Sequence, residues 1–150
     1  MLFRSAKADP LLEVAREWLA RADRRLAPEL VLVKPKRKAR DDVAVRREEA
    51  AALLAASAGC TRVALDATGR SFDSRAFAEA LERLLAAGRD VAFLVGGATG
   101  HDDAVLAVAD ATWSLSTLTF PHRLAVLVVA EQIYRASEID RKSTRLNSSH

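Results

Sequence analysis

The sequence predicts a single α/β domain built on a parallel sheet. Short apolar segments of strand length alternate along the chain with longer segments whose apolar residues recur every three or four positions. The apolar segments show no regular polar alternation, as expected for strands covered by helices on both faces. The chain has 150 residues and is 50% hydrophobic, enough for one core. We therefore expect one domain over residues 9–140, with at least four strands and five helices.

The first two predicted elements are a helix and a short strand. Asp9 and Pro10 are typical of a helix start, and apolar residues with helical spacing predict a helix over residues 9–26. The apolar run at residues 30–33 predicts a strand. Pro35 and the basic residues around it prevent this strand from continuing in a regular sheet.

The middle of the chain predicts two strand and helix pairs. A helix is expected over residues 41–59, between an aspartate that caps it and a glycine that ends it. Residues 62–65, RVAL, predict a strand, and residues 66–69 predict a turn. A helix is expected over residues 73–88. The segment at residues 91–95, VAFLV, is the most apolar one, and we expect it to be the central strand.

Two loops in the last third lie where ligands bind in α/β proteins. The turn Gly96–Gly100 follows the VAFLV strand and precedes a helix that begins near Asp102. The loop Leu115–Pro121 follows the next strand and precedes a helix over residues 121–136. Both loops leave the carboxyl ends of strands, and in an open α/β sheet ligands bind at that edge.

The chemistry of these loops leaves alternatives open. Glycines at 96, 97 and 100 allow a ligand phosphate to approach backbone N–H groups, but they also suit an ordinary tight turn. The GxGxxG spacing of dinucleotide sites is absent from this turn. Loop 115–121 mixes hydroxyl and apolar side chains, which suits a flat heterocycle, although its hydroxyls could simply cap the next helix.

The final helix predicts a second subunit. Seven consecutive apolar residues, Leu124 to Ala130, exceed what one helix face can bury. We expect its own sheet to cover one side and a second copy of the chain the other, as in a homodimer. The run is far shorter than the roughly 20 residues that span a bilayer, so we expect no membrane segment.

Composition limits the other function classes. Lysine and arginine total 23 against 20 acidic residues, but the last ten residues contain three basic residues and no acid, so 20 of each remain. The body of the protein is neutral, and its high pI does not argue for nucleic acid. A local basic stretch remains, either a solvated loop or a phosphate contact. Its five charged residues are Lys34, Lys36, Arg37, Lys38 and Arg40.

Cysteine content and the chain start indicate a cytoplasmic protein. Cys60 is the only cysteine, so no disulfide framework exists, which fits a reducing compartment. The chain opens with MLFRSAKA, which lacks the basic and apolar regions of a signal peptide. We assign no metal ligands.

Three motifs in order resemble one family. LVGGATG, WSLSTLTFPH and AEQIYRA are similar to motifs of the RlmH family, SPOUT-class methyltransferases, and the resemblance extends from Asp9 to Ile139. It implies methylation of N3 of a pseudouridine in 23S rRNA of the large ribosomal subunit, with S-adenosylmethionine as cofactor. It also implies a homodimer and a parallel sheet whose C-terminal part forms a trefoil knot.

The resemblance also implies site residues. His122 and Arg135 match family positions near the substrate, and each could instead be structural. Methyl transfer to an imide nitrogen needs positioning and removal of its proton. The implied cofactor pocket has apolar walls and a glycine backbone, and consists of Leu65, Gly96, Leu115, Ser116, Thr117, Leu118, Thr119 and Phe120.

Both ends of the chain differ from the family pattern. Family members begin with a strand of the MKLxxxAVG type and end in an HPYHR-like tail. We expect residues 1–8 to be an atypical segment that replaces the first strand, and residues 141–150 to be a non-native tail. The chain as written is then expected not to methylate RNA. Two other classes stay open, a nucleotide-binding α/β enzyme and a non-catalytic ribosome-binding module based on residues 34–40.

Overall fold

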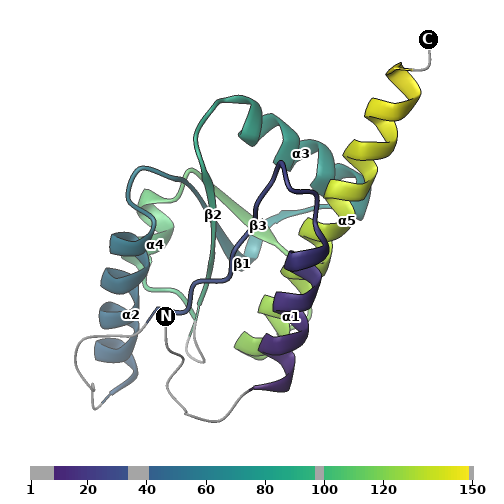
Figure 1. The fold of residues 1–150 in the computed structure, drawn as a ribbon. Coiled ribbons are helices and arrows are strands. Elements are labelled where there is room, and N and C mark those ends of the chain that lie inside the picture. The colour runs from purple at the N-terminus through teal and green to yellow at the C-terminus, as the bar shows by residue number, and fades with distance from the viewer. Residues whose placement is uncertain (1–8, 34–40, 97–99, 149–150) are drawn as a thin grey trace.

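The fold is an α/β arrangement of five helices and three strands within the described residues (Figure 1). A computed structural model describes residues 9–33, 41–96 and 100–148, with the backbone alone over 140–148. The expected atypical segment 1–8 and the basic stretch 34–40 lie outside these ranges. The elements are α1 (Pro10–Arg21), α2 (Asp42–Ala56), β1 (Thr61–Ser71), α3 (Ser74–Ala86), β2 (Val91–Val95), α4 (Asp103–Val108), β3 (Ala111–Ser114) and α5 (His122–Ser148).

The three strands form one parallel sheet in the order β2-β1-β3. This confirms the predicted fold class. The expectation that VAFLV is central was wrong, because β1 is the middle strand of the described sheet and β2 lies at its edge. The burial pattern explains the difference. Val63 and Ala64 of β1 point to opposite faces and are both 0% exposed, whereas four of the five β2 residues are only half-buried. The expected fourth strand is absent from the described residues.

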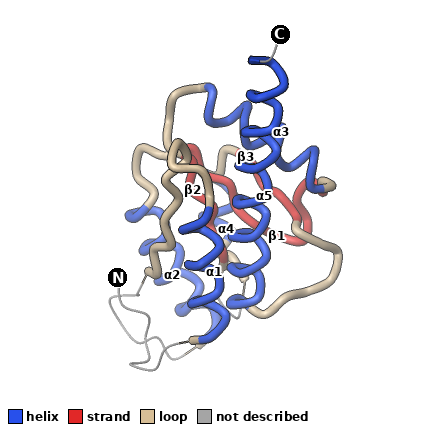
Figure 2. Tube along the Cα trace, turned by 45° about the vertical axis from the view of Figure 1, so that its right-hand side comes forward, coloured by secondary structure: helices blue, strands red, loops and turns tan. Residues whose placement is uncertain are grey.

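Helices cover both faces of the sheet (Figures 1 and 2). Val63 and Leu65 pack in a cluster with α3 and α5, on the side where α1 also lies against α5. Ala64, between them in β1, faces the opposite way and packs with Ala50 of α2 and Val105 of α4. Successive strand residues point to opposite faces, so this alternation produces the two helical layers.

The predicted turn at residues 66–69 is an irregularity inside β1. Leu65 and Arg70 are both aligned with Trp113 of β3, so the four residues between them protrude from the ladder. Gly69 closes this protrusion against β3. A Cβ at this position would lie 2.5 Å from the carbonyl oxygen of Thr112, so only glycine fits.

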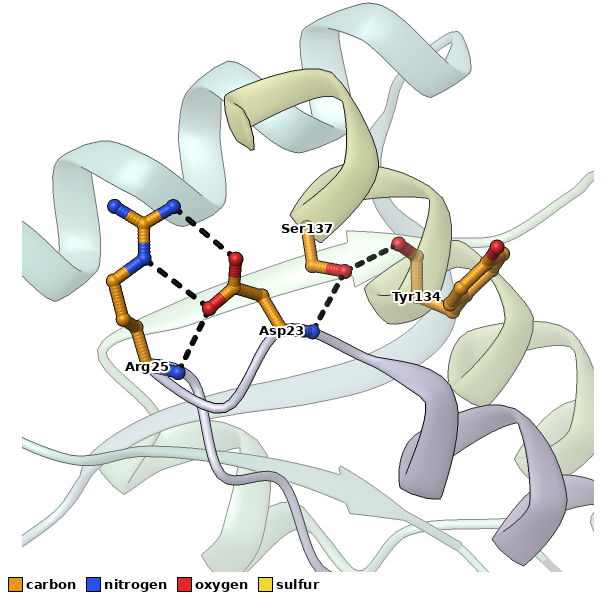
Figure 3. Close-up of polar contacts among 4 residues, drawn as sticks. All are labelled: Asp23, Arg25, Tyr134 and Ser137. Atoms are coloured by element: carbon orange, nitrogen blue, oxygen red, sulfur yellow. Dashed lines mark hydrogen bonds and ion pairs between the residues drawn. The ribbon is translucent and has the colours of Figure 1, made fainter. Parts of the chain in front are cut away.

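Helix α1 ends at Arg21 and not near Leu26, as the apolar spacing predicted. The backbone of Ala22 is extended, with ψ at 155°. The N–H of Asp23 donates to the Ser137 hydroxyl at 3.2 Å, and that hydroxyl donates to the Tyr134 carbonyl at 2.7 Å (Figure 3). The buried Ser137 side chain of α5 thus accepts the Asp23 N–H. If α1 had continued, this N–H would have bonded to a carbonyl of α1.

Residues 30–33 are irregular, so the prediction of a strand here was wrong. Leu32 is 5% exposed and packs with Leu12 of α1 and Val126 of α5, while Val31 is 52% exposed. The alternation of buried and exposed residues arises because an extended segment crosses two helices, without pairing to the sheet. The same pattern in a sequence reads as a strand.

Helix α5 is covered on two sides by its own chain. Val126 and Ala130 pack against α1, and Val129 and Ala136 pack in the cluster formed with α3 and the sheet. The apolar run therefore does not by itself require a second subunit, contrary to the sequence argument. The helix also continues past its predicted end at Ala136, to Ser148. None of the helices in the described ranges combines the length and hydropathy that a bilayer span needs.

Candidate functional site

The carboxyl ends of β2 and β3 lie beside Leu65, the last residue of β1 before its irregular part. Leu65 of β1 is aligned with Val95 of β2 and with Trp113 of β3. Gly96 follows β2 directly, and Leu115 follows β3 directly. The structure thus brings three of the predicted cofactor residues, Leu65, Gly96 and Leu115, to one edge, where parallel sheets bind ligands.

The glycine turn folds back tightly on itself. A Cβ at Gly96 would lie 3.0 Å from the carbonyl carbon of Gly100 and 3.1 Å from the backbone nitrogen of His101. Gly100 has a φ of +82°, a conformation that favours glycine. Residues 97–99 of the predicted turn lie outside the described residues. Gly96 therefore lies directly against the backbone of Gly100 and His101, with no side chain between them.

His122, a predicted catalytic residue, is bonded to this turn. Its Nδ1 lies 2.6 Å from the carbonyl oxygen of Gly96. A carbonyl oxygen can only accept, so Nδ1 carries the hydrogen and donates it. In the neutral imidazole, Nε2 then has a free lone pair. His122 begins α5, so the fold gives one ring nitrogen a positioning contact and leaves the other able to accept a proton.

Side-chain hydrogen bonds shape the loop after β3. The Ser114 hydroxyl donates to the carbonyl of Ser116 at 2.9 Å, and the Leu118 N–H donates to the Ser116 hydroxyl at 3.0 Å. These hydrogen bonds close local turns of the kind that serine side chains favour. They hold residues 114–118 in a bend at the carboxyl edge of the sheet.

The predicted apolar walls differ in exposure. Leu65 is 9% exposed and Leu115 packs against the same core cluster, so both contribute to the floor of this edge. Leu118 is 70% exposed and projects away from the core. Of the remaining predicted loop residues, Ser116 and Phe120 are half-buried, and Thr117 and Thr119 are exposed.

Arg135 lies away from His122 in a single chain. The two residues are 13 positions apart on α5, which corresponds to about 20 Å along a helix axis. The Arg135 guanidinium bonds Glu131 Oε1 from Nη2 at 2.7 Å and from Nε at 3.1 Å, and the arginine side chain is 53% exposed. The structure therefore does not bring the two predicted catalytic residues together within one protomer.

Sequence reasoning missed His101, which stands behind the glycine turn. Its Nε2 donates to the carbonyl oxygen of Leu94 at 2.8 Å. Burial lowers the pKa of His101, while the bond to Leu94, the charges of Asp66 and Glu49 and a weaker contact with the Leu65 backbone oppose that shift. Hydrogen bonds from the Thr68 side chain and backbone lower the pKa of Asp66.

One signal in the sequence could have revealed the group formed by His101, Asp66 and Glu49. Asp66 directly follows the strand that the sequence predicts at residues 62–65, a position that favours functional carboxylates. The described residues contain no group of three or more histidine, cysteine or acidic side chains that could hold a metal ion.

Comparison with known proteins identifies the family. Residues 1–144 match the family described as "Predicted SPOUT methyltransferase". Three similar proteins are each named Ribosomal RNA large subunit methyltransferase H. The one from Gluconacetobacter diazotrophicus is 46% identical over 127 residues, 84% of this chain and 84% of that protein. The one from Stenotrophomonas maltophilia strain R551-3 is 43% identical over 124 residues, 81% of this chain and 80% of that protein. The one from Anaeromyxobacter sp. strain Fw109-5 is 45% identical over 139 residues, 92% of this chain and 89% of that protein. This chain therefore belongs to the SPOUT methyltransferases and, within them, to the RlmH family.

Proposed function

We propose that the protein is an rRNA methyltransferase that uses S-adenosylmethionine to methylate N3 of a pseudouridine in 23S rRNA of the large ribosomal subunit. The similar proteins carry names that specify large-subunit ribosomal RNA as their substrate. The structural observation that carries the proposal is the His122 bond to Gly96 at the carboxyl edge of a parallel sheet. It joins the predicted catalytic residue to the predicted cofactor turn.

The residues at this edge fit the proposed cofactor. Adenine requires apolar surfaces and backbone hydrogen-bonding groups, and such sites combine a few polar groups with apolar walls. Leu65 and Leu115 supply apolar surface, and internal hydrogen bonds hold the bend of residues 114–118 at the same edge. The missing side chain at Gly96 lets the backbone of Gly100 and His101 fold closely against it, which keeps the turn compact at this edge. When bound, the cofactor supplies an electrophilic methyl group on a sulfonium.

The chain's own task is to position the target base and take its proton. N3 of pseudouridine carries an imide hydrogen, and the N–H bond must break before the nitrogen lone pair attacks a methyl carbon. Nε2 of His122 holds the free lone pair that can accept this proton, while Nδ1 keeps the ring fixed on Gly96. Holding the base in line with the methyl group supplies much of the acceleration in such a reaction.

Arg135 contributes to this site only if a second copy of the chain supplies it. It lies about 20 Å from His122 along α5, judged by the helical rise. We therefore propose a homodimer in which the site of one protomer receives the Arg135 guanidinium of the other. An arginine suits this role because its planar donors bind phosphate or a developing negative charge.

Light scattering tests the dimer. The expected mass is twice the 16.3 kDa of the chain, and Val128→Arg should lower it toward that of a monomer. Val128 is half-buried, whereas Val129 is 5% exposed within its own chain, so Val129→Arg serves as a control that disturbs folding. A folded monomer at micromolar concentration would contradict the proposed dimer.

Calorimetry tests the cofactor assignment. S-adenosylmethionine should bind saturably, and Gly96→Val and Leu118→Asp should weaken binding. Leu11→Asp is a matched control, because Leu11 is an exposed leucine of α1 outside the candidate site. Saturable binding of NAD(H) with no heat from S-adenosylmethionine would favour a nucleotide-binding enzyme instead. The ribosome-binding alternative rests on residues 34–40, which lie outside the described residues.

A further inference from the structure

His101 is held behind the glycine turn with one nitrogen unsatisfied. Its Nε2 donates a hydrogen bond to the carbonyl oxygen of Leu94, and Leu94 is the buried residue of β2. Its Nδ1 is buried and makes no hydrogen bond of normal geometry among the described residues, although the Leu65 backbone is near enough to act weakly on the pKa of the ring. In the neutral ring this nitrogen is an acceptor, so it is the atom at which His101 would take up a proton.

Two carboxylates from different elements act electrostatically on this ring. Asp66, in the irregular part of β1, accepts hydrogen bonds from the backbone and the side chain of Thr68. Glu49 of α2 has a buried Oε2 without a hydrogen-bond partner among the described residues. Its neighbour Ala50 packs against Leu94, which places this part of α2 over the end of β2.

Other nearby charge is directed elsewhere. The Asp102 carboxylate follows His101 in the chain but accepts the N–H of Ala104 at the start of α4. Among the described residues, the charges that act on the His101 ring are those of Asp66 and Glu49. The cluster therefore has two negative groups when His101 is neutral, and protonation of His101 offsets one of them.

The cluster directly adjoins two predicted cofactor contacts. Asp66 is the residue after Leu65, and the backbone nitrogen of His101 would lie 3.1 Å from a Cβ at Gly96. A change of charge here acts at short range, in surroundings where charges are screened less than in bulk water.

We propose that the cluster of Glu49, Asp66 and His101 makes the site discriminate between ligands by charge, favouring the cationic sulfonium cofactor over its neutral thioether product while His101 is neutral. This inference rests on the proposed function, because it assumes that S-adenosylmethionine binds at Gly96. Burial lowers the pKa of His101 and so keeps the ring neutral near pH 7. A site that releases the neutral product more readily than the cation would clear itself after each transfer.

The test compares the Kd of S-adenosylmethionine with that of S-adenosylhomocysteine by calorimetry from about pH 8 to about pH 5. The two ligands carry the same titratable groups, but the sulfonium lowers the pKa of the amine in S-adenosylmethionine. The comparison is therefore read below about pH 7, where the amines of both ligands are protonated. Protonation of His101 should reduce the preference for the sulfonium on the order of fivefold, the effect of one unit charge at short range. His101→Asn should remove this pH dependence, and Glu49→Gln should lower the preference at neutral pH without removing the histidine.

A parallel measurement needs no ligand. The chain has three histidines, so NMR of the imidazole protons, assigned by the loss of one signal in His101→Asn, gives the titration of His101 directly. The proposal requires that the Kd ratio changes over the same pH range as this signal. A ratio that is independent of pH, or one whose pH dependence persists in His101→Asn, would overturn it while leaving cofactor binding intact. If neither ligand binds, the proposed function itself is wrong.

Discussion

The Nδ1 of His122 lies 2.6 Å from the carbonyl oxygen of Gly96, and this contact ties the start of α5 to the end of β2. The bond assigns the hydrogen to Nδ1 and leaves the lone pair on Nε2. One residue thus holds the turn and presents a proton acceptor. A substitution can separate these two roles, because asparagine can replace the Nδ1 donor of imidazole but has no counterpart of Nε2.

His122→Asn should bind cofactor normally and lose turnover. The asparagine amide nitrogen lies near the position of Nδ1 and can donate to the Gly96 carbonyl, but nothing replaces Nε2. Loss of a general base lowers rates by roughly 10²-fold or more. The measurements are the Kd of S-adenosylmethionine and the rate of methyl transfer. Unchanged turnover would show that His122 only positions the turn.

Arg135→Ala should reduce turnover with little effect on stability. The pair with Glu131 is exposed and spaced i, i+4, and such pairs contribute about 0.3–0.5 kcal/mol to unfolding free energy. Glu131→Gln is the matched control, since it breaks the same pair and keeps the guanidinium. Thermal unfolding and methyl transfer should be measured for both variants. Equal losses of turnover in both would assign Arg135 a purely structural role.

Gly69→Ala should destabilise the protein by about 3 kcal/mol, at the upper end of typical overpacking costs. The added Cβ would meet the Thr112 carbonyl oxygen at 2.5 Å, and backbone of a neighbouring strand cannot easily move aside. Gly59→Asn is the control, because Gly59 has a φ of +80° and open space around it, so the cost there is at most about 1 kcal/mol. Denaturant unfolding of both variants checks the difference. Equal destabilisation would mean that the irregular part of β1 is adaptable.

Stability should fall as pH decreases below about 6.5, and His101 should account for part of the fall. The pKa of His101 is lowered from 6.5 in the folded protein, so below that value the unfolded chain binds a proton that the folded one does not. The pKa of Asp66 is lowered from 3.8, so its contribution is lost only at still lower pH. His101→Asn should flatten the decline of melting temperature between about pH 7.5 and 5.5. An unchanged slope would contradict the burial of the neutral ring.

The fold class and most element starts were predictable because they depend on local chemistry. Asp9, Asp41, Asp73 and Asp102 each cap a helix, as their positions before apolar periodic segments indicate. The parallel sheet follows from the apolar runs at residues 63–65 and 91–95, which pair in β1 and β2. Each of these features depends on only a few adjacent residues.

The errors arose where distant residues decide the structure. The end of α1 depends on Ser137, which is 114 positions from Asp23, and residues 30–33 pack on two helices in place of a sheet. His101 was missed because its partners Asp66 and Glu49 come from other elements. The roles of His122 and Arg135 and the knot came from family resemblance, whereas the dimer came from both the resemblance and the apolar run of α5. All of them stay predictions.

The most direct test of the proposed function is the position of the transferred methyl group. Ribosomes are incubated with labelled S-adenosylmethionine and either the chain as printed or a form with family-like ends, and the rRNA is then digested to nucleosides. We predict labelled N3-methylpseudouridine from 23S rRNA with at least the second form, and its loss in His122→Asn. Label on another nucleoside, label in small-subunit rRNA alone, or no transfer by either form would contradict the proposal.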